Sequence, residues 1–409
     1  MRPCTTDSTI ICVHDIAATA VSTPTTVPLD STGVAAPAPE PLRTLGRRAS
    51  GPGGIDSTGP VTDPENAVPF YAARTARLAV AGLTALALLT GCSGNEPLAT
   101  PRTIEPGRAA DSPATVVTPA GQIRPMQGTA QSAIFDPGTR SLVVLAGGPT
   151  PALRLFGEQP AARTVALPGG DASVTALAGD GPGRALLAAR GGYFTVDLTA
   201  GSATRVDVQG RPDAEFTAIV RRADGALVLG AADGTVVVLD GPSAVAHSSK
   251  IFARVDMLAV HDDTVLVLDR GQTLVTELKS DGGQDQALRA GEGATMMVAD
   301  PVGRVLVTDS RGNELLAFGV DPLIMRQRYP VHSVPYGLAG SATLTWVSTT
   351  ANNQIVGYDL STGIPVEKVR HPSVRQPDLL AYDDGTDTLY AVSTRGDGVQ
   401  VIPNASGRQ

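Results

Sequence analysis

From about residue 121 onward, short apolar runs alternate with turns that contain Gly or Asp, and no long stretch has a helical period. The runs form a repeated unit of three recognisable strands, of which the second is the most apolar. The units begin at residues 133, 176, 218, 257, 296, 337 and 379, so their spacing is 39 to 43 residues. A β-rich period of about 40 residues is typical of propeller blades, which bury their faces against each other. The pattern predicts an all-β, seven-bladed β-propeller with four-stranded blades over residues 121–403.

The last unit supplies three clear strands and ends near residue 403. Residues 121–128, "GQIRPMQG", precede the first unit and are similar to the outer-strand segments of later units. We predict that they form the outer strand of the last blade, because pairing there removes an exposed sheet edge. Residues 404–409 are predicted to be a disordered tail.

A different pattern lies upstream, where the uncharged run 78–89, "LAVAGLTALALL", follows Arg74 and Arg77. A short basic region, a short apolar region and small residues before a cleavage site predict a secretory signal peptide over residues 68–91. The run is too short to span a bilayer as a helix, which needs about 20 residues. The alternative is a buried helix with an incidental cysteine at its end.

The residues that end this run, "LTGC" at 89–92, resemble a bacterial lipobox. In such signals the cysteine sulfur receives a diacylglyceryl group and the chain is cut before the cysteine, so the resemblance implies that Cys92 is the lipidation site. We expect an anchored protein on the extracytoplasmic face of the cell membrane. Residues 92–120 are polar and rich in Pro, and they predict a flexible tether.

Residues 1–67 are rich in Pro, Gly, Ser and Thr and are predicted to be disordered. They stand before a signal peptide, although such peptides begin a chain. A GTG start at Val61 or Val68 would remove this conflict. We therefore hypothesise that the start is mis-assigned and that residues 1–67 are not translated.

Composition limits the chemistry of the propeller. The net charge of −8 argues against nucleic-acid binding, because phosphates require a basic surface. No cysteine follows Cys92, which excludes a disulfide, a thiolate metal site and a cysteine nucleophile after that position. Sequence motifs of serine hydrolases, zinc proteases and phosphate loops are absent, and no cofactor is predicted. The histidines in this region show no local metal-binding spacing; they are His247, His261, His332 and His371.

One polar pattern recurs in the turn between the second and third strands. An Arg-Gly pair occupies this turn in four units, at Arg190, Arg270, Arg311 and Arg395. The glycine suits a turn with positive φ, whereas nothing in the turn requires the arginine. These turns share one face of a propeller, so the arginines predict an anion-binding rim at the channel mouth. The alternative is that repeat duplication copied a soluble turn residue.

Residues 334–372 resemble a YVTN-type propeller repeat, with "PYGLA", an Asn-bearing turn and "DLSTG". Together with the lipobox and with "LAARGGYF" and "GVDPLIMRQRYPV", they are similar to the LppL-like family of mycobacterial and other actinobacterial lipoproteins. The similarity covers most of residues 78–403. It implies an exported, lipid-anchored propeller and does not imply an activity.

The sequence favours a monomeric binding or scaffolding module of the cell envelope over an enzyme. Its expected partners are the membrane, through the lipid on Cys92, and an envelope protein, glycan or lipid. One alternative is a lactonase-like hydrolase, which would need a metal held by carboxylate, His or Asn side chains from several blades. Another is an interaction hub without a small ligand. Propellers host unrelated functions, so the fold does not decide among these.

Overall fold

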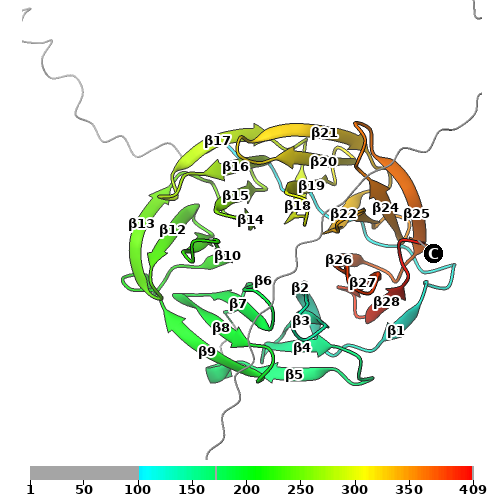
Figure 1. Cartoon of the computed structure of the whole chain (residues 1–409), viewed down its shortest axis with the longest axis horizontal. Helices are drawn as coiled ribbons and strands as arrows, with labels where there is room; N and C mark the ends of the chain where they lie inside the picture. The colour runs from blue at the N-terminus through cyan, green and yellow to red at the C-terminus, as the bar shows by residue number, and fades with distance from the viewer. Residues whose placement is uncertain (1–100, 171–172, 408–409) are drawn as a thin grey trace, which may run out of the picture. The chain divides into compact units, whose positions relative to one another are not determined.

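The computed structural model describes residues 101–170 and 173–407. Strands β1 to β28 form seven antiparallel sheets of four strands, and the sheets are arranged as blades around a central axis (Figure 1). The predicted seven-bladed β-propeller is confirmed. Residues 1–67, the predicted signal peptide 68–91 and Cys92 lie outside the described residues. Within the described ranges, no helix is both long and apolar enough to cross a membrane.

Each blade begins with a strand at its inner edge, beside the axis, and ends with a strand at its outer edge (Figure 1). Blade 1 contains β2 (Thr129–Asp136), β3 (Ser141–Gly147), β4 (Ala152–Phe156) and β5 (Arg163–Ala166). Blade 2 contains β6 (Ala176–Gly179), β7 (Arg184–Ala189), β8 (Gly192–Asp197) and β9 (Ser202–Asp207). Blade 3 contains β10 (Phe216–Arg221), β11 (Leu227–Ala231), β12 (Thr235–Asp240) and β13 (Ala244–Lys250). Blade 4 contains β14 (Met257–His261), β15 (Thr264–Asp269), β16 (Leu274–Leu278) and β17 (Gln284–Arg289).

The remaining blades have the same order. Blade 5 contains β18 (Ala294–Ala299), β19 (Arg304–Asp309), β20 (Glu314–Gly319) and β21 (Ile324–Pro330). Blade 6 contains β22 (Pro335–Gly340), β23 (Thr345–Thr349), β24 (Gln354–Asp359) and β25 (Val366–Pro372). Blade 7 contains β26 (Pro377–Asp383), β27 (Thr388–Ser393), β28 (Val399–Pro403) and β1 (Gln122–Arg124). A short 3-10 turn, η1 (Pro168–Gly170), links blades 1 and 2.

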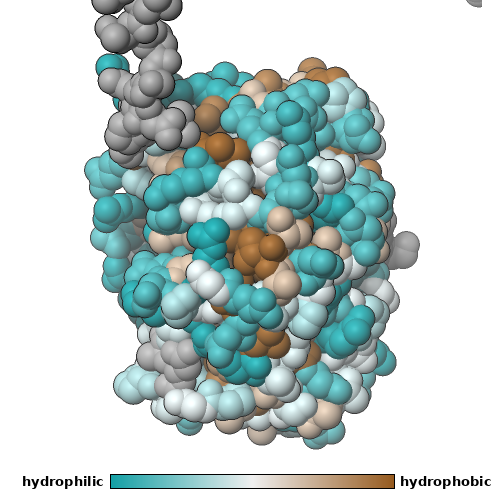
Figure 2. Space-filling view, turned by 90° about the vertical axis from the view of Figure 1, so that its left-hand side faces the viewer, coloured by the Kyte–Doolittle hydropathy of each residue, from teal (hydrophilic) through white to brown (hydrophobic). Residues whose placement is uncertain are grey.

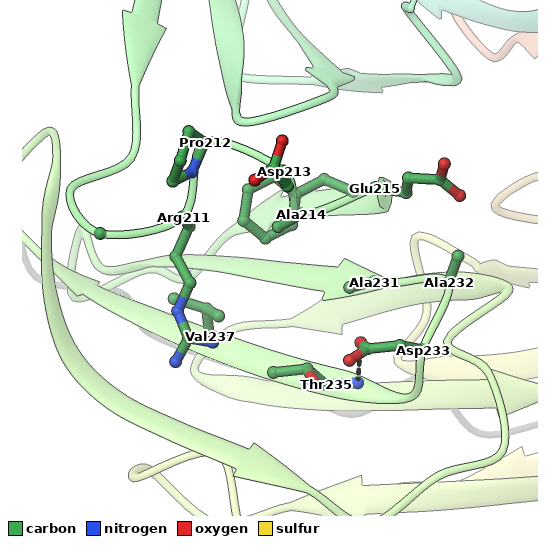
Figure 3. A pocket seen from close by; sticks show the side chains of 12 residues that line it. Arg211, Pro212, Asp213, Ala214, Glu215, Ala231, Ala232, Asp233, Thr235 and Val237 are labelled. Atoms are coloured by element: carbon green, nitrogen blue, oxygen red, sulfur yellow. Dashed lines mark hydrogen bonds between the residues drawn. The ribbon is translucent and has the colours of Figure 1, made fainter.

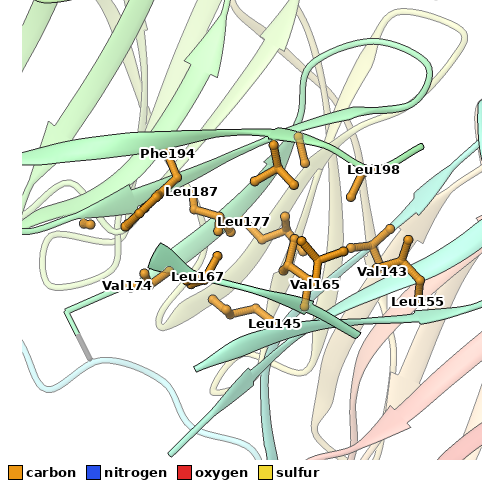
Figure 4. Packing of buried hydrophobic residues seen from close by; sticks show 14 residues of the cluster. Val143, Leu145, Leu155, Val165, Leu167, Val174, Leu177, Leu187, Phe194 and Leu198 are labelled. Atoms are coloured by element: carbon orange, nitrogen blue, oxygen red, sulfur yellow. The ribbon is translucent and has the colours of Figure 1, made fainter. Parts of the chain in front are cut away.

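The core lies between the blades rather than at the axis. The second and third strands are apolar on both faces, as in β3, where six consecutive residues are buried. Their side chains form one apolar cluster at each junction of neighbouring blades. Between blades 1 and 2, Leu145 and Val165 pack with Leu187 and Phe194 (Figure 4). The outer strands consist mainly of exposed and half-buried residues, which alternate strictly in β21. The outer surface in Figure 2 is mostly hydrophilic.

The ring closes as the sequence predicted. Strand β1 pairs antiparallel with β28, with Ile123 opposite Gln400, and so supplies the outer strand of the last blade. The guanidinium of Arg124 then reaches blade 1, where it donates hydrogen bonds to the carbonyls of Gly157 (2.7 Å), Gln159 and Pro160 (3.1 Å). It also lies over the ring of Phe156, 5.2 Å from the centroid. One side chain therefore joins the two ends of the ring.

Residues 404–407 pack against the ring, unlike the disordered tail predicted for 404–409, of which residues 408 and 409 lie outside the described residues. Ala405 is fully buried against the junction of blades 6 and 7, next to Trp346 and Ile402. Its carbonyl lies 2.8 Å from Nε2 of His371, and the amide of Ser406 donates to the carboxylate of Asp387. The tail is therefore held to the blade 6–blade 7 junction by the burial of one small apolar residue, Ala405. A single buried residue produces no periodic pattern, so the sequence did not predict this contact.

We predict that Arg124→Ala lowers the free energy of unfolding by about 1–3 kcal/mol, since it leaves three carbonyls at the ring seam without this donor. Arg124→Lys should recover only part of the loss, because an ammonium lacks the planar fork of donors. Urea unfolding of both variants measures the effect. Equal stability of the alanine variant and the wild type would show that the strand pairing alone closes the ring.

Candidate functional site

Residues 104–113, which we call the strap, cross one face of the propeller over blades 4 to 7 and appear as part of the cyan segment in Figure 1. They belong to the predicted flexible tether 92–120, and over this part the chain is instead held by hydrogen bonds. The ring side chains that hold it are Arg270, Arg311, Thr350, Asn353, Gln376 and Arg395. All lie on the face that carries the turns between second and third strands.

Most of these contacts reach the strap's main chain. The amide of Gln376 donates to the carbonyl of Ala110 at 2.9 Å and accepts from the amide of Ser112 at 3.1 Å. Asn353 donates to the carbonyl of Pro113 at 2.8 Å. Because the ring binds the backbone of the strap, these contacts do not require particular side chains in the strap sequence. This is why its composition is typical of a tether although the segment is docked.

The axial channel opens on the same face. It forms a cavity of about 390 Å³ lined by residues from all seven blades. Each blade contributes one equivalent residue to the channel wall, namely the residue that directly precedes the predicted start of its repeat. All seven of these residues are polar. We call them the axial ring: Ser132, Thr175, Thr217, Asp256, Thr295, Tyr336 and Asp378.

Two members of the axial ring are carboxylates, on blades 4 and 7. Asp256 accepts hydrogen bonds from the Arg254 guanidinium (3.0 Å) and the Arg270 amide (2.8 Å). Asp378 accepts from the Thr394 hydroxyl (2.6 Å) and the Gln376 amide (3.1 Å). Burial raises the pKa of both carboxyls above the ordinary value, although these hydrogen bonds act in the opposite direction.

The four arginines predicted at the channel mouth divide into two groups. Arg270, Arg311 and Arg395 bind the strap, and among the four only Arg270 also lines the channel. Arg190 instead pairs with the carboxylate of Glu215 at 2.6 Å. All four stand in turns between second and third strands, and three of the guanidinium groups have partners from the strap. The anion-binding rim stays a prediction.

The surroundings of Arg190 also differ in charge. A second cavity of about 590 Å³ lies on blade 3, close to its partner Glu215. Asp213 and Asp233 lie on opposite walls of it (Figure 3). Asp233 also accepts a hydrogen bond from Lys250 at 3.0 Å. Carboxylates outnumber the arginine, Arg211, that lines this cavity, so it does not match the predicted anionic ligand.

The sequence reasoning did not single out Arg254, Asp256 or Asp378. The sequence did contain a pattern that could have indicated these channel residues. The position before every repeat start is polar, and two of the seven residues there are acidic. None of His247, His261, His332 and His371 lines the channel. Among the described residues, no group of three His, Cys, Asp or Glu side chains could hold a metal ion.

No protein-family model matches the chain, and no curated protein matches it. Its fold is similar to solved structures of very different sequence. A streptogramin B lyase is 9% identical, with a TM-score of 0.58, and the match covers 69% of this chain and 97% of the lyase. A chain in a mitotic checkpoint complex is 10% identical, with a TM-score of 0.59 and coverage of 72% and 98%.

A catalytically inactive virginiamycin B lyase from Staphylococcus aureus, solved with quinupristin, is 11% identical. Its TM-score is 0.55, with coverage of 68% of this chain and 97% of the lyase. Lyases and a checkpoint complex thus share one architecture with this chain. At such identities the similarity establishes the propeller fold and transfers no activity.

We predict a pH-dependent effect of Asp378→Asn on stability. The pKa of Asp378 is raised in the folded state, so its ionisation costs stability as pH rises from the ordinary carboxyl pKa through the raised one. The amide removes this titration. We expect the variant's Tm to exceed the wild-type value by roughly 2 °C at neutral pH and to equal it in acid, by differential scanning calorimetry. Asp240→Asn, at an exposed carboxylate, serves as the control; a gap that is constant with pH would contradict the prediction.

Proposed function

We propose that the chain is a lipid-anchored, extracytoplasmic propeller that acts as a binding module of the cell envelope, with the axial channel as its ligand site. The observation that carries the proposal is the axial ring, which is polar at every blade and includes Asp256 and Asp378. Asp256 and Asp378 are half-buried. Carboxylates with raised pKa values destabilise a fold, so their presence in a cavity favours a functional role. The similarity to LppL-like lipoproteins supports the same cellular setting.

The polar lining suits a small ligand with several hydrogen-bonding groups, such as a glycan fragment or a polar headgroup. The channel wall also has apolar members, including Leu177, Ile219 and Met257, so part of the ligand surface can be apolar. Mixed linings of this kind are usual in small-molecule sites, where a few polar groups orient the ligand.

The strap supports a defined orientation at the membrane. Lipidation and cleavage at Cys92 would leave only residues 93–100 between the lipidated cysteine and Pro101. Even a fully extended chain of this length spans about 30 Å. In this proposal the strap face, which also carries the channel mouth, therefore stays near the membrane surface. A diacylglyceryl group supplies two acyl chains, which suffice for stable anchoring.

The anchor is tested with Cys92→Ala in the full chain. We expect the variant to lose the mass of the diacylglyceryl group and to keep the signal peptide in intact-protein mass spectrometry, because cleavage before Cys92 follows its lipidation. Asn95→Ala, which lies just after the cysteine, is the matched control and should change neither result. A variant that carries the same lipid mass as the wild type would contradict lipid anchoring at Cys92.

The ligand site is tested with the compact unit Ser93–Gln409. This unit is incubated with envelope extract and examined by native mass spectrometry. We expect a discrete small-molecule adduct that the Asp256→Asn/Asp378→Asn variant lacks and the Asp240→Asn control keeps. An adduct of equal intensity in all three proteins would rule out the axial ring as its site. The absence of any adduct would argue for protein partners instead.

A further inference from the structure

We propose that Arg270, Arg311 and Arg395 form an anion-binding site that the strap occupies and masks. The inference rests on the proposed binding function and extends it, because it adds a second ligand position on the same face. Its ligand class is a phosphate or carboxylate group, whether free or part of a lipid headgroup. We call these three residues the arginine site.

Each guanidinium of the arginine site is met by an oxygen of the strap. Arg311 donates to the carbonyl of Glu105 and Arg270 to the carbonyl of Gly107, both at 2.6 Å. Arg395 forms an ion pair with the carboxylate of Asp111. Two carbonyls and one carboxylate thus occupy positions where oxygens of external anions could bind.

The strap accepts hydrogen bonds from only some of the N–H groups of these arginines. A guanidinium carries five N–H donors, and it binds phosphate or carboxylate best through two parallel hydrogen bonds. Arg270 gives one guanidinium hydrogen bond to the strap, and its buried Nε has no partner among the described residues. A carbonyl supplies no charge, so two of the three arginines lack a counter-charge from the strap. Arg311 donates a second hydrogen bond to the ring carbonyl of Glu292 at 3.3 Å. An anion would therefore supply the missing charge at both arginines and the second acceptor at Arg270.

The strap is also held in a way that permits exchange. The Asp111 side chain is 89% exposed and that of Arg395 is 47% exposed, so solvent screens their ion pair and it contributes little. Only Gly107 and Ser112 of the strap are buried, and Ile104 is 40% exposed. Release of the strap therefore uncovers polar groups rather than the apolar core.

Arg190 falls outside the arginine site for a local reason. Its guanidinium is paired with Glu215, a side chain of the ring itself, whatever the position of the strap. It occupies the same turn of its blade as the other three arginines. Arg190 is therefore the matched control residue for the site.

Gly107 provides a way to release the strap without changing the ring. A Cβ at this position would lie 2.2 Å from the carbonyl oxygen of Gly293, which is backbone and cannot move aside. Gly107→Val should therefore undock the strap, which hydrogen–deuterium exchange of residues 101–113 measures directly. Gly363→Val is the control, because a Cβ there meets no atom within 4 Å. Deletion of residues 101–113 is the second route if the valine variant keeps the strap docked.

Binding of inorganic phosphate to Ser93–Gln409 is measured by isothermal titration calorimetry. We expect the strap-released variant to bind about tenfold more tightly than the wild type and the Gly363→Val control, as one added charge-assisted hydrogen bond would give. Adding Arg311→Ala and Arg395→Ala should abolish the gain, whereas adding Arg190→Ala should preserve it. The proposal would be overturned if phosphate bound with equal affinity to the wild type and to the strap-released variant. It would also be overturned if the gain in affinity persisted after Arg311 and Arg395 were replaced by alanine.

Vesicles of phosphatidylcholine with and without phosphatidylglycerol distinguish the two sources of the anion. Arginine-dependent binding to the anionic vesicles by the strap-released variant would identify a lipid headgroup, and binding of phosphate alone would identify a free anion. The native-mass test changes Asp256 and Asp378, whereas the phosphate test changes Arg311 and Arg395, which do not line the channel. Arg270 borders both places and is left unchanged in both tests, so a failure of the axial ring and a failure of the arginine site can be told apart.

Discussion

Closure of the ring between blade 7 and blade 1 is the constraint on which the rest of this structure depends. Every apolar cluster lies between two blades, so each blade needs a neighbour on both sides to bury its faces. Six of the seven junctions join blades that follow each other in the chain. The seventh joins the two ends, and there strand β1 pairs with β28 while Arg124 reaches blade 1.

The strap leads into the closing strand. Strand β1 lies at the outer edge of blade 7, and residues 104–113 before it cross one face of blades 4 to 7. Polar side chains on this face bind main-chain groups of the strap. The channel mouth and the arginines share this face because the starts of the inner strands and the turns between second and third strands lie at the same end of every blade.

Much of the fold could be predicted from the sequence, because the repeat period and the apolar second strands are local signals that recur in each blade. The segment 121–128 is recognisable as the closing strand for the same reason: it is similar to other outer strands. The strap and the burial of Ala405 could not be predicted in this way. The strap is held by hydrogen bonds to its main-chain carbonyls, and Ala405 is held by burial of one methyl group. Neither kind of contact produces a periodic pattern in the sequence.

The candidate site could be predicted in part. Four arginines stand in equivalent turns of the repeat, and their shared face follows from the repeat alone. Their different roles depend on partners far away in the chain: Glu215 for Arg190, and strap residues more than 160 positions away for Arg270 and Arg395. Likewise, the charge of the channel depends on Asp256 and Asp378, which line it from blades 4 and 7. By itself the sequence determined the blades, their number and the closing strand, since these follow from local periodicity. Only the tertiary structure decided which polar side chains bind each other, because contacts between single residues far apart in the chain produce no periodic pattern in the sequence.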